Sequence, residues 1–310
     1  MPVTATETPA PSGVQYDIGH GRHQLVVTEV GATIRSYTVG GRAVLDGFDV
    51  DDLCDSGRGQ VLAPWPNRLG DGRYSYEGRE GRAALDEPDR HNAIHGLVRW
   101  APWQVVSRAQ NVLALGCTLQ PQPGYPWRVA LALEYRLGRD GLTVSSSATN
   151  LDRTPAPFGI GFHPYLTLSA PIDATSLAIP ARRRLVTDDR GLPTGGTAVS
   201  GSEFDFTAPR WIGDTVLDTA FTDFRRDADG MARVELDDTA GGRGVTIWMD
   251  GHFGYVMVFT GDTLEPASRR RASIAVEPMS CPPDAFRTGV DLVRLEPGAS
   301  WSGRWGISPR

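Results

Sequence analysis

The chain has 310 residues, of which 40% are hydrophobic and 22% charged, and its formal net charge is −6. This composition is typical of a globular protein, and the acidic balance argues against nucleic acid as a partner. All 31 cationic side chains are arginine, which excludes chemistry based on a lysine nucleophile or a P-loop lysine. The sequence contains no run of about 18 apolar residues, so we expect neither a transmembrane helix nor a membrane partner.

Residues 1–13 have neither a basic start nor an apolar core, so they predict a flexible tail rather than a signal peptide. We expect a single domain over residues 14–310, because no repeat or low-complexity linker divides it. Three cysteines, odd in number and far apart, favour a reducing, cytoplasmic location over disulfides or a metal site. We expect a monomer or a homodimer.

Short strands are predicted along the chain, because 36 glycines and 23 prolines leave little room for long helices. An apolar run at 23–30 comes first. The clearest pattern is at 128–150, where apolar residues alternate on both sides of a Gly-Arg-Asp-Gly turn, as in a β-hairpin. Runs at 245–249 and 255–260 flank a predicted tight turn, and residues 264–275 predict a loop or one short helix. The sequence therefore predicts an all-β fold, a large antiparallel β-sandwich.

Several polar side chains stand among aromatic residues, prolines and glycines, a setting that suits a sugar site. Arg68 follows two prolines, and a guanidinium held in this way can bind two neighbouring hydroxyls. His91 and His95 are four residues apart, but neither a helical pattern nor a third ligand supports a zinc site. A hydrogen-bonding His95 is the preferred interpretation. A surface salt bridge for the arginine and a structural role for the histidine stay open.

Three further residues are candidates for acid–base chemistry. His163 lies between aromatic residues and a proline, and an imidazole can donate a proton near neutral pH. Asp218 precedes an aromatic residue by three positions and offers an acceptor for vicinal hydroxyls. Glu277 directly follows the apolar, strand-like run 272–276. A carboxylate at the end of a buried strand is desolvated, so we expect Glu277 to act as a base. A core histidine, a turn aspartate and a solvated edge glutamate are the plainer alternatives.

In combination these stretches resemble the aldose 1-epimerase (galactose mutarotase) family from about residue 20 to the C-terminus. The matching pieces, in order and spacing, are Asn67-Arg68-Leu69, Gly72-Arg73-Tyr74, Asn92 to Gly96 with Trp103, His163-Pro164-Tyr165, Asp218 to Phe221, and Glu277 with Pro283-Asp284-Ala285. The resemblance implies a galactose mutarotase-like supersandwich. It also implies an isomerase that interconverts the α and β anomers of a sugar with no metal or organic cofactor.

Roles follow from the resemblance by position. It makes His163 the general acid and Glu277 the general base, and it places Arg68, His95 and Asp218 in the set that binds hydroxyls. The base takes the proton of the C1 hydroxyl while the acid protonates the ring oxygen. The ring opens, the C1–C2 bond rotates, and reclosure gives the other anomer. Each placed proton transfer contributes about 10²–10⁴ in rate.

The blocks WPNRLGDGRY and NAIHGLVRWAPW look most like a bacterial subgroup associated with sulfoquinovose mutarotation. Sulfoquinovose has a sulfonate in place of the C6 hydroxyl, so its site needs a cation. We expect Arg99 or one of Arg182–Arg184 to supply it. A hexose-6-phosphate 1-epimerase, a non-catalytic sugar-binding sandwich and a glycoside-processing enzyme, which would need a second catalytic carboxylate, are the alternatives.

Overall fold

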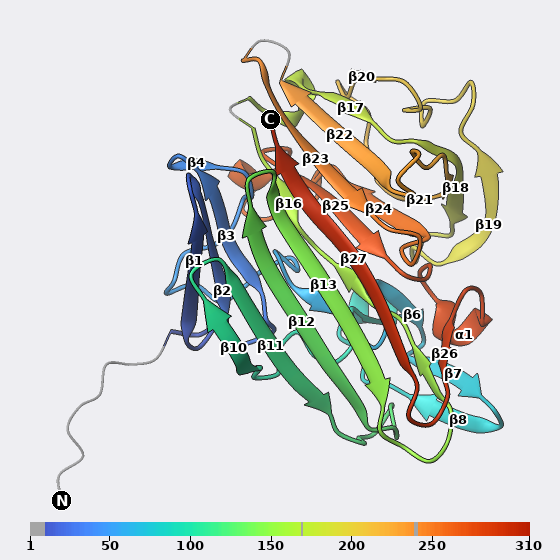
Figure 1. Ribbon diagram of the computed structural model, residues 1–310. Helices are drawn as coiled ribbons and strands as arrows, with labels where there is room; N and C mark the ends of the chain where they lie inside the picture. The colour runs from blue at the N-terminus through green and yellow to red at the C-terminus, as the bar shows by residue number, and fades with distance from the viewer. Residues whose placement is uncertain (1–9, 169, 239–240) are drawn as a thin grey trace, which may run out of the picture.

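The computed structural model describes residues 10–168, 170–238 and 241–310, and its regular structure is almost entirely antiparallel β-sheet (Figure 1). This confirms the all-β expectation. Most of the tail expected over residues 1–13 lies outside the described residues. Across the described ranges, none of the helices has the length and apolar character needed to cross a membrane.

Two large sheets dominate the fold. The first has nine strands in the order β10 (Gln104–Ala109), β11 (Val112–Leu119), β12 (Val129–Gly138), β13 (Gly141–Asn150), β27 (Ser300–Pro309), β23 (Arg243–Met249), β22 (Ala232–Asp238), β17 (Ser176–Ala178) and β20 (Arg210–Trp211). The second has eight strands, in the order β19 (Pro193–Ala198), β18 (Ala181–Thr187), β21 (Asp218–Phe224), β24 (Tyr255–Phe259), β25 (Ile274–Met279), β15 (Gly161–Phe162) and β5 (Val61–Leu62), with β16 (Tyr165–Leu166) also paired to β25.

Smaller elements surround these sheets. An N-terminal sheet consists of β1 (Gln15–His20), β2 (His23–Thr28), β3 (Ile34–Val39) and β4 (Arg42–Ala43). Three strand pairs join β6 (Arg68–Gly70) to β9 (Asn92–Ile94), β7 (Arg73–Tyr76) to β8 (Arg79–Arg82), and β14 (Ala156–Phe158) to β26 (Val293–Leu295). The short helical turns are η1 (Pro88–Arg90), η2 (Ile172–Ala174), η3 (Ala267–Arg269) and α1 (Ala285–Thr288).

The predicted hairpin at 128–150 is confirmed as β12 and β13, which pair from Val129 with Asn150 to Gly138 with Gly141. Burial alternates along both strands, as the apolar period of two requires. The run at 264–275 contains the short turn η3, which agrees with the expectation of a loop or one short helix.

The predicted turn at 251–254 does not close a β-hairpin. It joins β23 to β24, but β23 pairs with β22 and β27 in the nine-stranded sheet, whereas β24 pairs with β21 and β25 in the other. The turn therefore carries the chain between the two sheets. Both strands are mostly buried, so their sequences contain no clear signal for which neighbours they pair with.

Aromatic packing between the sheets forms the core. The ring of Phe162 in β15 lies 5.1 Å from that of Trp305 in β27, and both side chains are almost fully buried. In β25, Ile274 and Val276 belong to this core. Since side chains alternate along a strand, Glu277 lies on the opposite, outer face of the eight-stranded sheet.

The expectation that Glu277 ends its strand was wrong. β25 continues through Pro278 and Met279, which pair with Val256 and Tyr255 of β24. Glu277 is therefore held on both sides along the chain by strand geometry, which fixes its direction more firmly than a strand end would.

Candidate active site

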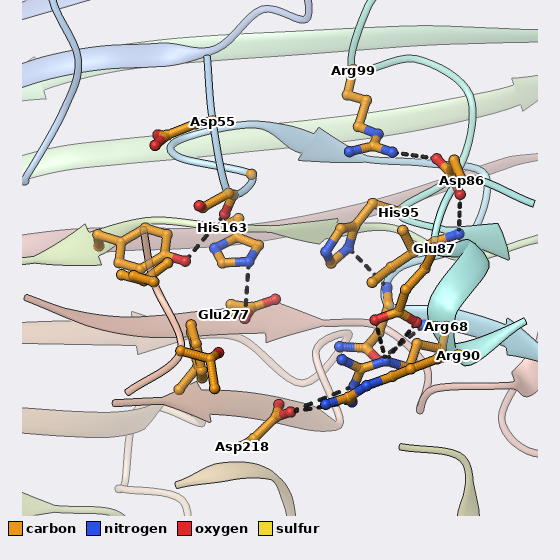
Figure 2. A pocket seen from close by; sticks show the side chains of 18 of the residues that line it. Asp55, Arg68, Asp86, Glu87, Arg90, His95, Arg99, His163, Asp218 and Glu277 are labelled. Atoms are coloured by element: carbon orange, nitrogen blue, oxygen red, sulfur yellow. Dashed lines mark hydrogen bonds and ion pairs between the residues drawn. The ribbon is translucent and has the colours of Figure 1, made fainter. Parts of the chain in front are cut away.

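A cleft of about 630 Å³ opens on the outer face of the eight-stranded sheet, against loops from the first hundred residues. It is lined by all six residues singled out from the sequence (Figure 2), namely Arg68, His95, Arg99, His163, Asp218 and Glu277. These side chains come from segments up to 209 positions apart in the sequence.

His163 and Glu277 meet in this cleft. Nε2 of His163 lies 3.3 Å from Oε1 of Glu277, and the two side chains are 7% and 2% exposed. Nδ1 of His163 and Oε2 of Glu277 have no hydrogen-bond partner within the described ranges. A buried polar atom without a partner is costly, so both side chains are held in place at the expense of desolvation.

Burial shifts the pKa values of this pair in opposite directions. It lowers the pKa of His163 to about 3, helped by the charges of Arg58 and Arg99. It raises the pKa of Glu277 well above the usual range, with Asp218 adding to the rise and Arg68 opposing it. Since burial penalises a charge on either group, the site favours the arrangement in which both are uncharged and one proton is shared between them.

His95 is held as a neutral hydrogen-bond donor. The ring Nδ1 of His95 accepts a hydrogen bond from the backbone N–H of Asn67 at 3.3 Å. The backbone N–H of His95 donates to the Asn67 carbonyl at 2.9 Å. Burial and the nearby His163 lower the pKa of His95 well below its usual range. With Nδ1 used as an acceptor, the proton of the neutral ring is on Nε2. His91 lies apart from this site, 65% exposed and paired with Asp71, so the two histidines do not converge.

Arg68 is fixed by carboxylates on two sides. Its Nε lies 3.0 Å from Glu87, and its Nη1 lies 3.7 Å from Asp218 at the start of β21. Burial works against its charge, but Asp218 and Glu87 outweigh it and raise the pKa of the guanidinium. Gly191 makes this position possible, because a Cβ there would lie 2.6 Å from Nη1 of Arg68. The Arg68–Asp218 pair is thus preformed for vicinal hydroxyls, one partner donating and the other accepting.

Arg99 reaches the cleft wall from the loop after β9 and donates to Asp86. Its side chain is 15% exposed. The alternative cations, Arg182 to Arg184, are not among the lining residues of the cleft. They lie on β18, where Arg182 is close to Asp223 and the guanidinium of Arg184 lies 3.8 Å from the centre of the Phe204 ring. Of the cations considered for the C6 substituent, Arg99 thus lies at the cleft, whereas Arg182–Arg184 do not line it.

Sequence reasoning missed the carboxylates that hold the two arginines. Asp86 binds Arg99 and Glu87 binds Arg68, so two adjacent residues fix two cleft cations. Arg90 also lines the cleft, 3.9 Å from Asp218. The only signal in the sequence was an acidic segment just before the histidine-containing block, and a short acidic segment is ordinarily a solvated loop.

Comparison with known proteins agrees with this fold. A family model described as aldose 1-epimerase matches residues 14–308, and the chain therefore belongs to the aldose 1-epimerase family. A relative from Escherichia coli K12, the uncharacterized protein YihR, is 31% identical over 289 residues, covering 93% of this chain and 90% of its own length. A second relative from the same organism, YphB, is 27% identical over 289 residues, covering 92% and 95%.

Solved structures share the architecture. The GalM/aldose epimerase homologue from C. elegans superposes with a TM-score of 0.85 at 17% identity, covering 96% of this chain and 98% of its own. The galactose 1-epimerase from Lactobacillus acidophilus NCFM gives a TM-score of 0.78 at 17% identity, covering 96% and 94%. The antiparallel sandwich expected from the sequence is thus confirmed, and these likenesses establish the fold alone.

Proposed function

We propose that the protein interconverts the α and β anomers of a hexose-type sugar, with His163 as general acid and Glu277 as general base. The observation that carries the proposal is the 3.3 Å contact between two buried side chains in a cleft of sugar size. A binding module would gain little from a buried acid and base that each keep an unpartnered polar atom.

The proposed step moves two protons and breaks one bond. Glu277 takes the proton of the C1 hydroxyl while His163 donates a proton to the ring oxygen. The C1–O bond to the ring oxygen breaks, and the open chain holds an aldehyde at C1. After rotation about C1–C2, Glu277 returns its proton to the carbonyl oxygen and His163 takes one back from the attacking hydroxyl. The other anomer results with no net change in protons.

The electrostatics of the pair favour ring opening. The reactive form has His163 protonated and Glu277 ionised, one proton transfer away from the uncharged form that burial favours; after the step both groups are uncharged. Burial disfavours both charges, so the surroundings favour the proton transfers that open the ring. Arg68, His95 and Asp218 would hold the sugar hydroxyls during the rotation, because their own partners already fix them.

Saturation-transfer NMR of anomer exchange tests this function. Glucose, galactose, sulfoquinovose and glucose 6-phosphate are compared with and without the protein. We expect exchange of at least one sugar to be accelerated, and H163N to abolish the acceleration. If no sugar exchanges faster, the proposal fails, and a non-catalytic sugar-binding role gains support.

The finer proposal is that sulfoquinovose is the preferred sugar, with Arg99 facing the sulfonate. It is supported by the sequence resemblance and by the position of Arg99 on the cleft wall. A neutral hexose is the second candidate, because the lining residues include six carboxyl groups against three guanidinium groups. That excess of negative charge opposes an anionic ligand unless Arg99 contacts it directly.

The variant R99M separates these two sugars. If the sulfonate binds at Arg99, we expect KM for sulfoquinovose to rise about tenfold or more, while KM for glucose changes little. R136M is the matched control, because Arg136 is half-exposed and pairs with Glu134 on β12. Equal changes for both sugars would remove Arg99 from sulfonate recognition.

We further propose a cytoplasmic protein that is a monomer or a homodimer. The location is supported by the three cysteines, all free thiols, two of them buried. Size-exclusion chromatography with light scattering tests the oligomeric state.

A further inference from the structure

A buried arginine lies behind the proposed acid, outside the set that faces the cleft. Arg58 is in the turn before β5, and its side chain is 1% exposed. Its Nη1 contacts Asp46 at 2.8 Å and its Nε contacts Asp55 at 2.9 Å, while Nη2 has no hydrogen-bond partner in the part of the chain that is described. Burying a guanidinium is costly even when it is paired, so a role beyond filling space is worth seeking.

The guanidinium of Arg58 and the imidazole of His163 each lie against the ring of Tyr165. The guanidinium carbon of Arg58 is 4.5 Å from the centre of that ring. The imidazole of His163 is stacked on the ring, with centroids 5.0 Å apart and planes 15° from parallel. Tyr165 itself is fixed because its hydroxyl donates to the carbonyl of Ser56 at 3.1 Å.

The turn that holds Arg58 also holds His163. The backbone N–H of Gly59 donates to the His163 carbonyl at 2.9 Å, and the N–H of His163 donates to Gln60 at 3.1 Å. Gly57 has a φ of +75°, and a Cβ there would lie 2.7 Å from Cδ2 of His163. The turn therefore lies directly against the imidazole edge, and movement of Arg58 would be transmitted to His163 by both the backbone and the ring stack.

We propose that Arg58 and Tyr165 form a positioning stack that orients the His163 imidazole and restricts its uptake of a proton. This inference rests on the proposed function. A ring face attracts a cation, and a cation–π contact with Arg58 already uses the electrostatic attraction of the Tyr165 ring. A protonated His163 would be a second cation beside the same ring. The acid is thereby kept ready to lose its proton to a weakly basic ring oxygen.

Other charged and titratable groups surround His163 as well. Glu277 contacts it directly, and His95 meets its ring edge-on at a centroid distance of 5.3 Å. The charge of Arg99 acts in the same direction as that of Arg58 and lowers the pKa of His163. The test must therefore change Arg58 while leaving these groups in place.

The deciding measurement is a side-chain ¹⁵N NMR titration of His163, assigned by comparison with H163N, together with the pH profile of kcat/KM. In R58M we expect the apparent pKa of His163 to rise by roughly one unit, the effect of removing a unit charge at an effective dielectric constant of about 20. The acid limb of the pH profile moves upward by the same amount. R58K keeps the charge and should restore the wild-type titration.

R271M is the matched control. Arg271 also forms two ion pairs, with Asp173 and Asp262, at 18% exposure, but it does not line the cleft. It should lose stability without moving the His163 titration. If R58M does not fold, Y165L decides instead: we expect kcat to fall about tenfold or more with little change in KM.

A His163 titration in R58M that matches the wild type would overturn the proposal, as would an unchanged kcat in Y165L. The titration needs no turnover. A wild-type protein that accelerates no sugar therefore refutes the proposed function, while the stack is still judged by NMR alone.

Discussion

The two walls of the cleft are built in different ways. On the sheet wall, Glu277 extends from the middle of β25 and His163 from the link between β15 and β16, and both keep a polar atom without a partner in the described structure. On the loop wall, Arg68, His95 and Arg99 each have a partner within the protein. The acid and the base contact each other and are otherwise positioned by the strands and the neighbouring rings, whereas the groups of the loop wall are held by ion pairs and backbone hydrogen bonds.

A site can combine reactivity with order when its reactive groups and its binding groups are held in different ways. A group that must give or take a proton needs a perturbed pKa, and burial without a partner provides it. Such a group can remain in place only if strands and neighbouring rings position it. A group that only binds hydroxyls can be ordered by a carboxylate or a backbone N–H, because its hydrogen-bonding role does not depend on changing charge.

The largest effect is expected on the sheet wall. E277Q removes the base with little change in shape, so kcat should fall about 100-fold or more while the circular dichroism spectrum is unchanged. H163N should have a comparable effect. Because the two groups act as a unit, the double variant should be little worse than either single one. A folded variant with nearly wild-type turnover would remove that residue from the mechanism.

A smaller effect is expected on the loop wall. E87Q leaves Arg68 without its nearest charged partner, and Arg68 should then bind sugar in a less fixed orientation. We expect KM to rise about tenfold with a smaller change in kcat, as measured by initial anomer-exchange rates. E80Q, at an exposed glutamate of β8, is the control. A large fall in kcat at constant KM would show that the two walls are not functionally separate.

The pH dependence of activity should reveal the shared proton. The active pair holds one proton, and burial opposes both a second proton on His163 and the loss of the last proton from Glu277. Activity should therefore persist as pH falls below 6.5, where an ordinary histidine would become protonated, and should decline only in more acidic solution. If kcat/KM instead falls to half of its maximum near pH 6.5 as the pH is lowered, the two groups do not share a proton in the way proposed.

The smallest effect concerns stability. The pKa of Glu277 is raised in the folded state, so its contribution to stability is fully present below the unfolded value of about 4.5 and is lost as pH rises through the folded value. E277Q cannot ionise. Its Tm should exceed that of the wild type at pH 8.5 by about 2–4 °C for each kcal/mol gained, and the difference should vanish near pH 4.5. Equal Tm values across this range would mean that Glu277 is not desolvated.

Three of the six candidate residues stood in an unusual local setting, and the family resemblance supplied the others. Prolines precede Arg68, aromatic residues surround His163, and an apolar run leads into Glu277. Asp86 and Glu87 escaped prediction because nothing local distinguishes a carboxylate that binds an arginine across a cleft from one that faces solvent. The arginines of β18 do not line the cleft, and their charge alone could not show this, because contacts such as that of Arg184 with the Phe204 ring depend on the tertiary fold.

Alternation and turn residues act over a few positions, so the sequence alone specifies the all-β class and the β12–β13 hairpin. It also supplied, through its family resemblance, the order of the chemical groups. The tertiary structure sends β23 and β24 into different sheets and places Glu277 inside its strand. It alone brings both the Arg58 guanidinium and the His163 imidazole against the ring of Tyr165. Pairing across a sheet and stacking across a core depend on residues far apart in the chain, and a local pattern cannot specify such partners.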